Sequence, residues 1–203
     1  MGDQTKRAPR TPAPTLGEEV RARFASLERI RLSEMARLFR RGVPALGLSD
    51  PEFPARARVA WIDERPWFDF ADEIEEDRPT EAVLIFVARD EIGEPVDLIA
   101  WEPKAGRLGE WMARSPVLGL ETLWRPRLSL DGALPVFIDP WRWLIAGRDG
   151  LLLIDQQRAL PILRDAGLLL AESIDFGERL LDLMTAKPPR ILAITNATEA
   201  RCG

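Results

Sequence analysis

The sequence predicts an α/β fold with a mixed sheet: an N-terminal helical arm, then an antiparallel hairpin, then a βαβα unit with parallel pairing. Two apolar runs, 81–89 and 95–102, flank a short loop that contains Gly93, which is typical of a hairpin. Short apolar runs then alternate with helical segments, which is typical of parallel strands joined by crossover helices. Apolar residues at helical spacing mark the arm over 16–41.

The arm begins at a capping box, in which Thr15 is followed three residues later by Glu18. Residues 16–41 form either two helices or one bent helix, because the apolar phase slips near Ile30. In the two-helix interpretation Ser33 caps the second helix, which ends at Gly42.

The first hairpin run, 81–89, is apolar on both faces, which favours a central strand covered on both sides. Further along, Asp139 and Pro140 predict a helix start, and Gly147 predicts its end. The remaining elements are expected as strand 150–155, helix 156–166, strand 168–172, helix 174–184 and a last strand at 190–195.

These elements divide the chain into four expected parts. They are a disordered tail at 1–14, a helical arm with a Pro-rich connector at 15–56, a single mixed α/β domain at 57–198, and a frayed C-terminus at 199–203.

Composition excludes several kinds of chemistry. The 203 residues include no His and one Cys, so His-dependent nucleophile systems, His-ligated zinc and Cys clusters are excluded. No Gly-rich phosphate-binding motif occurs. No apolar run is long enough to span a bilayer, and we expect a cytoplasmic protein with no membrane contact.

Carboxylates are the remaining catalytic candidates. Asp155 and Glu172 follow predicted parallel strands, and Asp175 lies three residues further on. Ligands gather at the carboxyl ends of such strands, and Mg²⁺ prefers oxygen ligands. The alternative is that these acids cap the following helices, which we favour, so no cofactor is expected unless a Mg²⁺ site forms.

A protein partner is the other expectation. Trp143 lies about 160° from Trp141 around the 140–146 helix, so one of the two leaves its main buried face. Trp143 is the candidate partner contact, and cover by the helical arm is the favoured alternative. The strongly acidic stretch 69–77 is typical of a solvated turn before a strand, the interpretation that we favour. The alternative is a surface for a basic partner or for the chain's own basic arm, with Asp72, Glu73, Glu75 and Glu76 as candidate contact residues. The net charge of -5 disfavours direct nucleic-acid binding, and self-association stays open.

Three segments carry a resemblance: VARDEIGEPVDLIAWEP (87–103), FIDPWRWLIAGRDGLLLID (137–155) and LLLAESIDFGERLLDLM (168–184). They are similar to segments of small uncharacterised proteins encoded by phages and integrated mobile elements of alphaproteobacteria. The resemblance covers about residues 80–185 and implies a genomic context rather than an activity.

A weaker resemblance is to phage primases with a toprim domain, carried by DEIGEPV (90–96) and LLLAESIDFGERL (168–180). It implies acid–base and metal chemistry at Glu172. The chain departs from that pattern at Ser173, where the family has Gly, and RILAITNATEA (190–200) lacks the family's downstream acidic pair. A toprim-like protein that has lost its site fits the pattern better than an active enzyme.

The sequence-based hypothesis is therefore a non-enzymatic accessory protein of a phage or mobile element that acts through protein–protein contacts. One alternative is a degenerate, toprim-like, metal-dependent protein of phosphoryl transfer or nucleic-acid processing. The other is an acidic inhibitor that mimics nucleic acid through residues 69–77.

Overall fold

The computed structural model describes residues 15–44, 53–62, 65–74, 78–123 and 132–185. The predicted tails, most of the Pro-rich connector and the predicted strand at 190–195 lie outside these residues. The predicted fold class is confirmed: the chain is mixed α/β, with parallel and antiparallel pairing, and its strands form two sheets.

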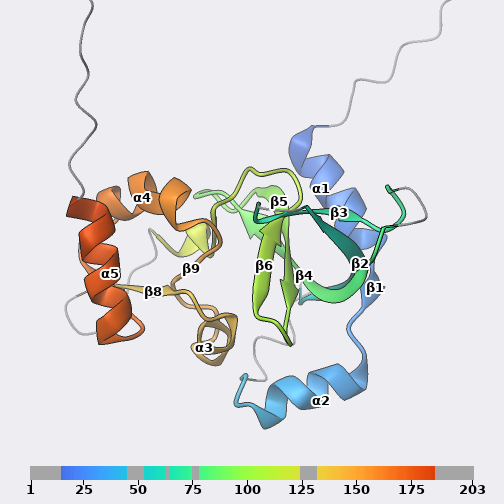
Figure 1. Cartoon of the computed structure of the whole chain (residues 1–203), viewed down its shortest axis with the longest axis horizontal. Helices are drawn as coiled ribbons and strands as arrows, with labels where there is room; N and C mark the ends of the chain where they lie inside the picture. The colour runs from blue at the N-terminus through green and yellow to red at the C-terminus, as the bar shows by residue number, and fades with distance from the viewer. Residues whose placement is uncertain (1–14, 45–52, 63–64, 75–77, 124–131, 186–203) are drawn as a thin grey trace, which may run out of the picture.

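The first sheet closes on itself as a small barrel (Figure 1). Its ring runs β2-β3-β6-β5-β4, and β4 pairs back to β2. The strands are β2 (Ala55–Ile62), β3 (Trp67–Phe70), β4 (Glu81–Arg89), β5 (Pro95–Glu102) and β6 (Arg107–Glu110), with the short β1 (Glu28–Arg29) added beside β2. The predicted hairpin is β4 and β5, in antiparallel register from Leu84 opposite Trp101 to Arg89 opposite Pro95.

Side chains of β4 and β5 serve two hydrophobic clusters, because successive residues of a strand point to opposite faces. One face lines the barrel interior with Val83, Ile85, Val87, Leu98 and Ala100. The other face packs toward the second sheet with Leu84, Phe86, Ala88, Ile99 and Trp101. The expectation of a strand covered on both sides is therefore confirmed for β4.

Trp61 fills part of the barrel interior opposite a glycine. A Cβ atom at Gly109 would lie 2.7 Å from the Trp61 ring, and the backbone of Pro66 lies almost as close. Glycine at this position lets the indole lie against the backbone of β6.

The predicted arm is two helices, α1 (Leu16–Ala25) and α2 (Leu32–Arg40), separated by β1. The capping box is confirmed, since the Thr15 amide donates to the Glu18 carboxylate and the Glu18 amide donates to the Thr15 hydroxyl. The predicted Ser33 cap is wrong: the N-cap lies two residues earlier, at Arg31, because the Glu34 carboxylate accepts the Arg31 amide at 3.0 Å. Helix α1 packs on the barrel and buries Val20 in its core.

The second sheet has the order β10-β8-β9-β7. Its strands are β7 (Val117–Leu118), β8 (Leu134–Phe137), β9 (Leu151–Leu153) and β10 (Leu169–Ala171). A short 3₁₀ helix, η2 (Leu120–Thr122), follows β7. Strands β8, β9 and β10 are each followed by a helix: α3 (Pro140–Ile145), α4 (Gln156–Asp165) and α5 (Ile174–Thr185). β8 pairs parallel with both β9 and β10, as the predicted crossover unit requires. Helices α4 and α5 lie together on one side of the molecule in Figure 1, and both contribute to the cluster around Leu163 and Phe176.

Candidate functional site

The acids predicted at the strand ends are helix caps or backbone acceptors. Asp155 accepts the amides of Gln157 and Arg158, at 3.0 and 3.1 Å, and caps α4. Glu172 accepts the amides of Ile138 and Asp139, at 3.2 and 3.3 Å, where β8 leads into α3.

The structure does not bring these acids into one cluster. Strand β8 separates β9, which Asp155 follows, from β10, which Glu172 follows. Asp175 is exposed in the first turn of α5. Within the described ranges, no three acidic or Cys side chains lie together as a metal site requires.

Trp143, expected as a partner contact, is instead a core residue. Only 1% of its surface is exposed, and its ring packs edge-on against Phe86 of the barrel, with 5.7 Å between the two ring centres. Its Nε1 donates to the Gly150 carbonyl at 3.0 Å. Trp141 is the half-buried member of the pair, with the Arg41 guanidinium at 4.2 Å from its ring centre, so the arm covers part of it.

The acidic stretch contacts the chain's own basic arm. Arg23 of α1 donates through both terminal nitrogens to Asp72, and it lies 3.4 Å from Glu73. Trp111 Nε1 also donates to Glu73, at 3.2 Å. Glu75 and Glu76 lie outside the described residues. Two of the four predicted contact acids are therefore engaged within the chain.

Replacing Arg23 with Met is expected to raise the pKa of Asp72 toward its ordinary value, because the hydrogen bond from Arg23 holds that pKa down. Methionine keeps an apolar stem over Phe70, on which Arg23 now stacks at 3.9 Å. Because the pKa of Asp72 is lower in the folded protein than in the unfolded chain, its ion pair stabilises the fold at a pH above the unfolded-state pKa. This stabilisation is lost as the pH falls through the folded-state pKa. The pair is exposed, so its contribution to the free energy of unfolding is about 1 kcal/mol at most.

An NMR titration of the Asp72 carboxyl measures this shift. Arg78→Met is the matched control, because Arg78 pairs with Asp69 in the same stretch. An Asp72 pKa that does not move in Arg23→Met would show that the ion pair is absent in solution.

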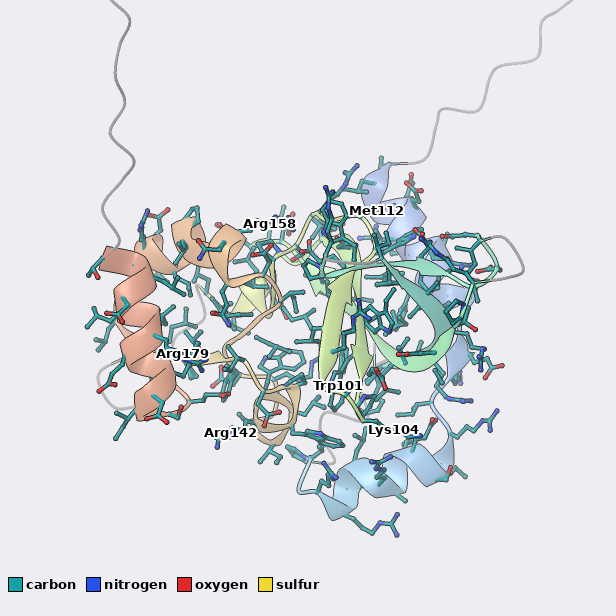
Figure 2. All side chains as sticks on the ribbon, in the orientation of Figure 1. Trp101, Lys104, Met112, Arg142, Arg158 and Arg179 are labelled. Carbon is teal, nitrogen blue, oxygen red and sulfur yellow. The ribbon has the colours of Figure 1, made fainter. Side chains whose placement is uncertain are left out.

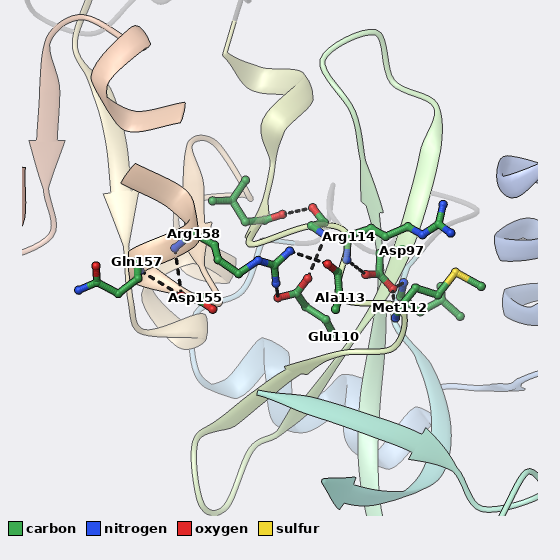
Figure 3. A network of polar contacts seen from close by, with 11 residues as sticks. Asp97, Glu110, Met112, Ala113, Arg114, Asp155, Gln157 and Arg158 are labelled. Carbon is green, nitrogen blue, oxygen red and sulfur yellow. Dashed lines mark hydrogen bonds and ion pairs between the residues drawn. The ribbon is translucent and has the colours of Figure 1, made fainter. Parts of the chain in front are cut away.

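A buried polar network joins the barrel to the second sheet (Figure 3). Asp97 of β5 accepts the amides of Leu98, Met112 and Arg114 at 2.8–2.9 Å. Burial raises the pKa of Asp97, while these backbone donors oppose the rise. The carboxylate thus organises the loop that follows β6.

Glu110 of β6 is the centre of that network. One of its oxygens lies 2.5 Å from the Arg158 guanidinium of α4, and the other accepts the Ser115 amide at 2.9 Å. Burial, reinforced by the charge of Asp97, raises its pKa to about 7 although Arg158 lowers it. Arg158 also donates to the Ala113 carbonyl, so the network fastens α4 and the loop to the barrel.

A cavity with convergent polar groups lies at one end of the barrel. A cavity of about 370 Å³ lies between α2, the strands β2, β4 and β5, and Trp141 of α3. In Figure 2 Lys104 marks its position between the barrel and α2. Leu38, Val83 and Leu84 supply apolar walls. A cleft of this size with apolar walls and a few polar groups is the usual form of a small-ligand site.

Two carboxylates meet in this cavity. Glu81 is the first residue of β4 and Glu102 is the last of β5, so the hairpin brings them together. Glu81 accepts a hydrogen bond from Trp61 Nε1 at 2.8 Å. Burial, and then the hydrogen bond and charge of Glu81, raise the pKa of Glu102. Glu102 therefore holds a proton more tightly than an isolated surface carboxylate does.

Cations line the same cavity. Arg56 is bound by Glu28 and Glu34, at 3.1 and 3.0 Å. Arg37 of α2 and Lys104 after β5 are exposed and form no ion pair with any residue that the structure describes. The cavity thus offers an acidic pair and two cations that are available to a ligand.

This site is not among those predicted from the sequence. Glu81 and Glu102 stand at the outer ends of the two hairpin strands, and such ends lie side by side. An acid at each outer end was the signal that could have found the pair. The contribution of α2 and Trp141 depends on tertiary packing, which no local pattern carries.

No family model, curated protein or solved structure matches this chain. The geometry of the cavity is therefore the basis for proposing a function. The resemblance to phage and mobile-element proteins accordingly stays a prediction. None of the helices described here is long and apolar enough to cross a membrane.

Proposed function

We propose that the chain is a binding protein for a small zwitterionic ligand of the amino-acid class, held in the cavity between α2 and the barrel. The carrying observation is the pair of carboxyls Glu81 and Glu102, which line one cavity together with the cations Arg37 and Lys104. A carboxyl with a raised pKa beside a second carboxyl in a cleft, as Glu102 is, is a recognised marker of functional sites.

The charges define the ligand. An ammonium group would lie between the carboxyls of Glu81 and Glu102 and donate hydrogen bonds to them, and a carboxylate would pair with Arg37 or Lys104. The apolar walls at Leu38, Val83 and Trp141 favour an apolar side chain. A cavity of about 370 Å³ suits a single amino acid or a short peptide rather than a nucleotide with its phosphates.

This proposal differs from the protein-contact hypothesis because of where the predicted contact residues lie. Trp143 is buried, and Asp72 and Glu73 are engaged by Arg23. In the cavity, in contrast, Glu81 contacts Glu102 and Trp61, and Arg37 and Lys104 form no ion pair with any residue that the structure describes.

Calorimetric titration with L-leucine, N-acetyl-L-leucine and L-leucinamide tests the proposal, since the derivatives lack the ammonium and the carboxylate respectively. We expect leucine to bind about 10- to 100-fold more tightly than either, the value of one charged hydrogen bond. Glu102→Gln should weaken leucine and leucinamide but not N-acetyl-leucine. Lys104→Met should weaken leucine and N-acetyl-leucine but not leucinamide.

Glu178→Gln is the matched control, because Glu178 is exposed on α5, away from the cavity. The proposal is overturned if the three compounds bind with equal affinity. It is also overturned if no saturable heat is measured with ligand up to about 10 mM, a concentration at which weak binding is still detected.

A further inference from the structure

Strand β10 leaves an apolar edge at the end of the second sheet. It pairs with β8 on one side and is the last strand in the order. Leu168 and Leu170 are 60% and 55% exposed. Parallel sheets are normally covered on both faces, and a bare apolar edge is a surface for another strand.

Helix α5 extends this edge. Gly177 lies against β10, where its Cβ position is 3.4 Å from the Ala171 side chain. Around the helix axis, Leu181 lies about 40° and Ile174 about 60° from Gly177. Both lie on the side of Gly177 that is away from the buried Phe176 and Leu180. They are 61% and 80% exposed. This face of α5 therefore overhangs the free edge of β10.

We propose that this edge, defined by Leu168, Leu170, Ile174 and Leu181, binds residues 190–195 of the same chain as an added parallel strand. The sequence there is RILAIT, with four apolar residues and two β-branched isoleucines. Both the bare edge and the overhanging helix face are the surfaces that such a strand would cover.

Chain length and direction fit this occupant. Helix α5 runs back along the sheet for 12 residues, about 18 Å, so its end lies near the start of β10. Its last turn is held there by Arg164 of α4, which donates to the Met184 carbonyl. Four residues, the number from 186 to 189, can span at most about 13 Å, more than the separation of neighbouring strands. A strand added beyond β10 would complete a right-handed crossover, the usual hand.

Charge supports the same occupant. Asp175, Glu178 and Asp182 form an exposed acidic strip beside Ile174 and Leu181 on α5. The segment that follows α5 brings Lys187 and Arg190 ahead of its apolar residues. A basic, apolar segment is the complement of an acidic, apolar surface.

Hydrogen exchange on the full chain tests this inference. We expect the amides of residues 191–194 to exchange at least about tenfold more slowly than those of residues 197–201, because strand pairing protects them. Leu170→Asp should abolish the difference without unfolding the protein, since the side chain is exposed. Leu32→Asp on α2, where Leu32 is 83% exposed, is the matched control and should leave it intact.

Three results would overturn the inference. Equal exchange of both groups of amides would show that the segment does not bind the edge. Protection that appears only at high protein concentration, together with a dimer in light scattering, would assign the edge to a second copy. Protection that survives Leu170→Asp would place the segment elsewhere.

Discussion

Replacing Arg158 with methionine is expected to lower the free energy of unfolding by about 2–3 kcal/mol at pH 8 and by much less at pH 5. At pH 8 the variant must either ionise the buried Glu110 without its partner or keep that carboxyl protonated at a pH where the parent chain ionises it, and breaking a buried pair costs several kcal/mol. Arg158 is partly exposed, so we place the cost at the lower end. At pH 5 Glu110 is protonated, because its pKa is about 7, and it needs no counter-charge.

The sign of the pH dependence follows from the raised pKa. The folded protein keeps the Glu110 proton up to about pH 7, whereas the unfolded chain releases it near 4.5. The contribution of this group to stability is therefore fully present below about pH 4.5 and is lost as the pH rises through 7. In Arg158→Met the loss continues above pH 7, since the pKa of Glu110 rises further.

Urea unfolding at the two pH values measures the effect. Arg164→Met on the same helix is the control and should cost at most about 0.5 kcal/mol at either pH. An equal loss for Arg158→Met at pH 5 and pH 8 would show that Glu110 does not titrate in this range.

Replacing Trp143 with alanine is expected to cost about 3–5 kcal/mol, the usual range for deleting a fully buried aromatic side chain. The indole contacts Phe86 of the barrel and Gly150 before β9, so its removal opens a cavity between the barrel and the second sheet. Trp143→Phe should cost about 1–3 kcal/mol, because it leaves the Gly150 carbonyl without a donor.

Thermal or urea unfolding followed by circular dichroism checks both values. Ile92→Ala in the hairpin loop, where Ile92 is 85% exposed, should stay within about 0.5 kcal/mol of the parent chain. A cost below about 1 kcal/mol for Trp143→Ala would contradict the tight contact between the two sheets.

Local signals predicted the local structure well. The capping box at Thr15, the β4–β5 hairpin, the Asp139 cap with Pro140 and the crossover elements around β9 and β10 each depend on neighbouring residues. The Ser33 cap failed because a carboxylate one position further on satisfied a different amide.

Closure of the barrel could not be predicted in this way. It depends on β2 pairing with both β3 and β4, and such pairing is decided by burial and side-chain fit between distant segments. The same holds for the cavity, whose acids lie on the barrel and whose cations lie on α2 and beyond β5. In contrast, the prediction that Asp155 caps a helix depends only on the residues of the first turn of α4, and it is confirmed.

The two-faced hairpin also sets an order for folding during synthesis. The barrel is complete once β6 ends at Glu110, so it can close while the remaining chain is still on the ribosome. Its outer face, with Phe86 and Trp101, is covered in part by Leu38 of α2 and gains the rest of its cover when the segment from Leu118 to Leu152 emerges. The nascent chain therefore passes through a stage at which a folded barrel displays a large apolar surface, a state in which intermediates aggregate or recruit chaperones.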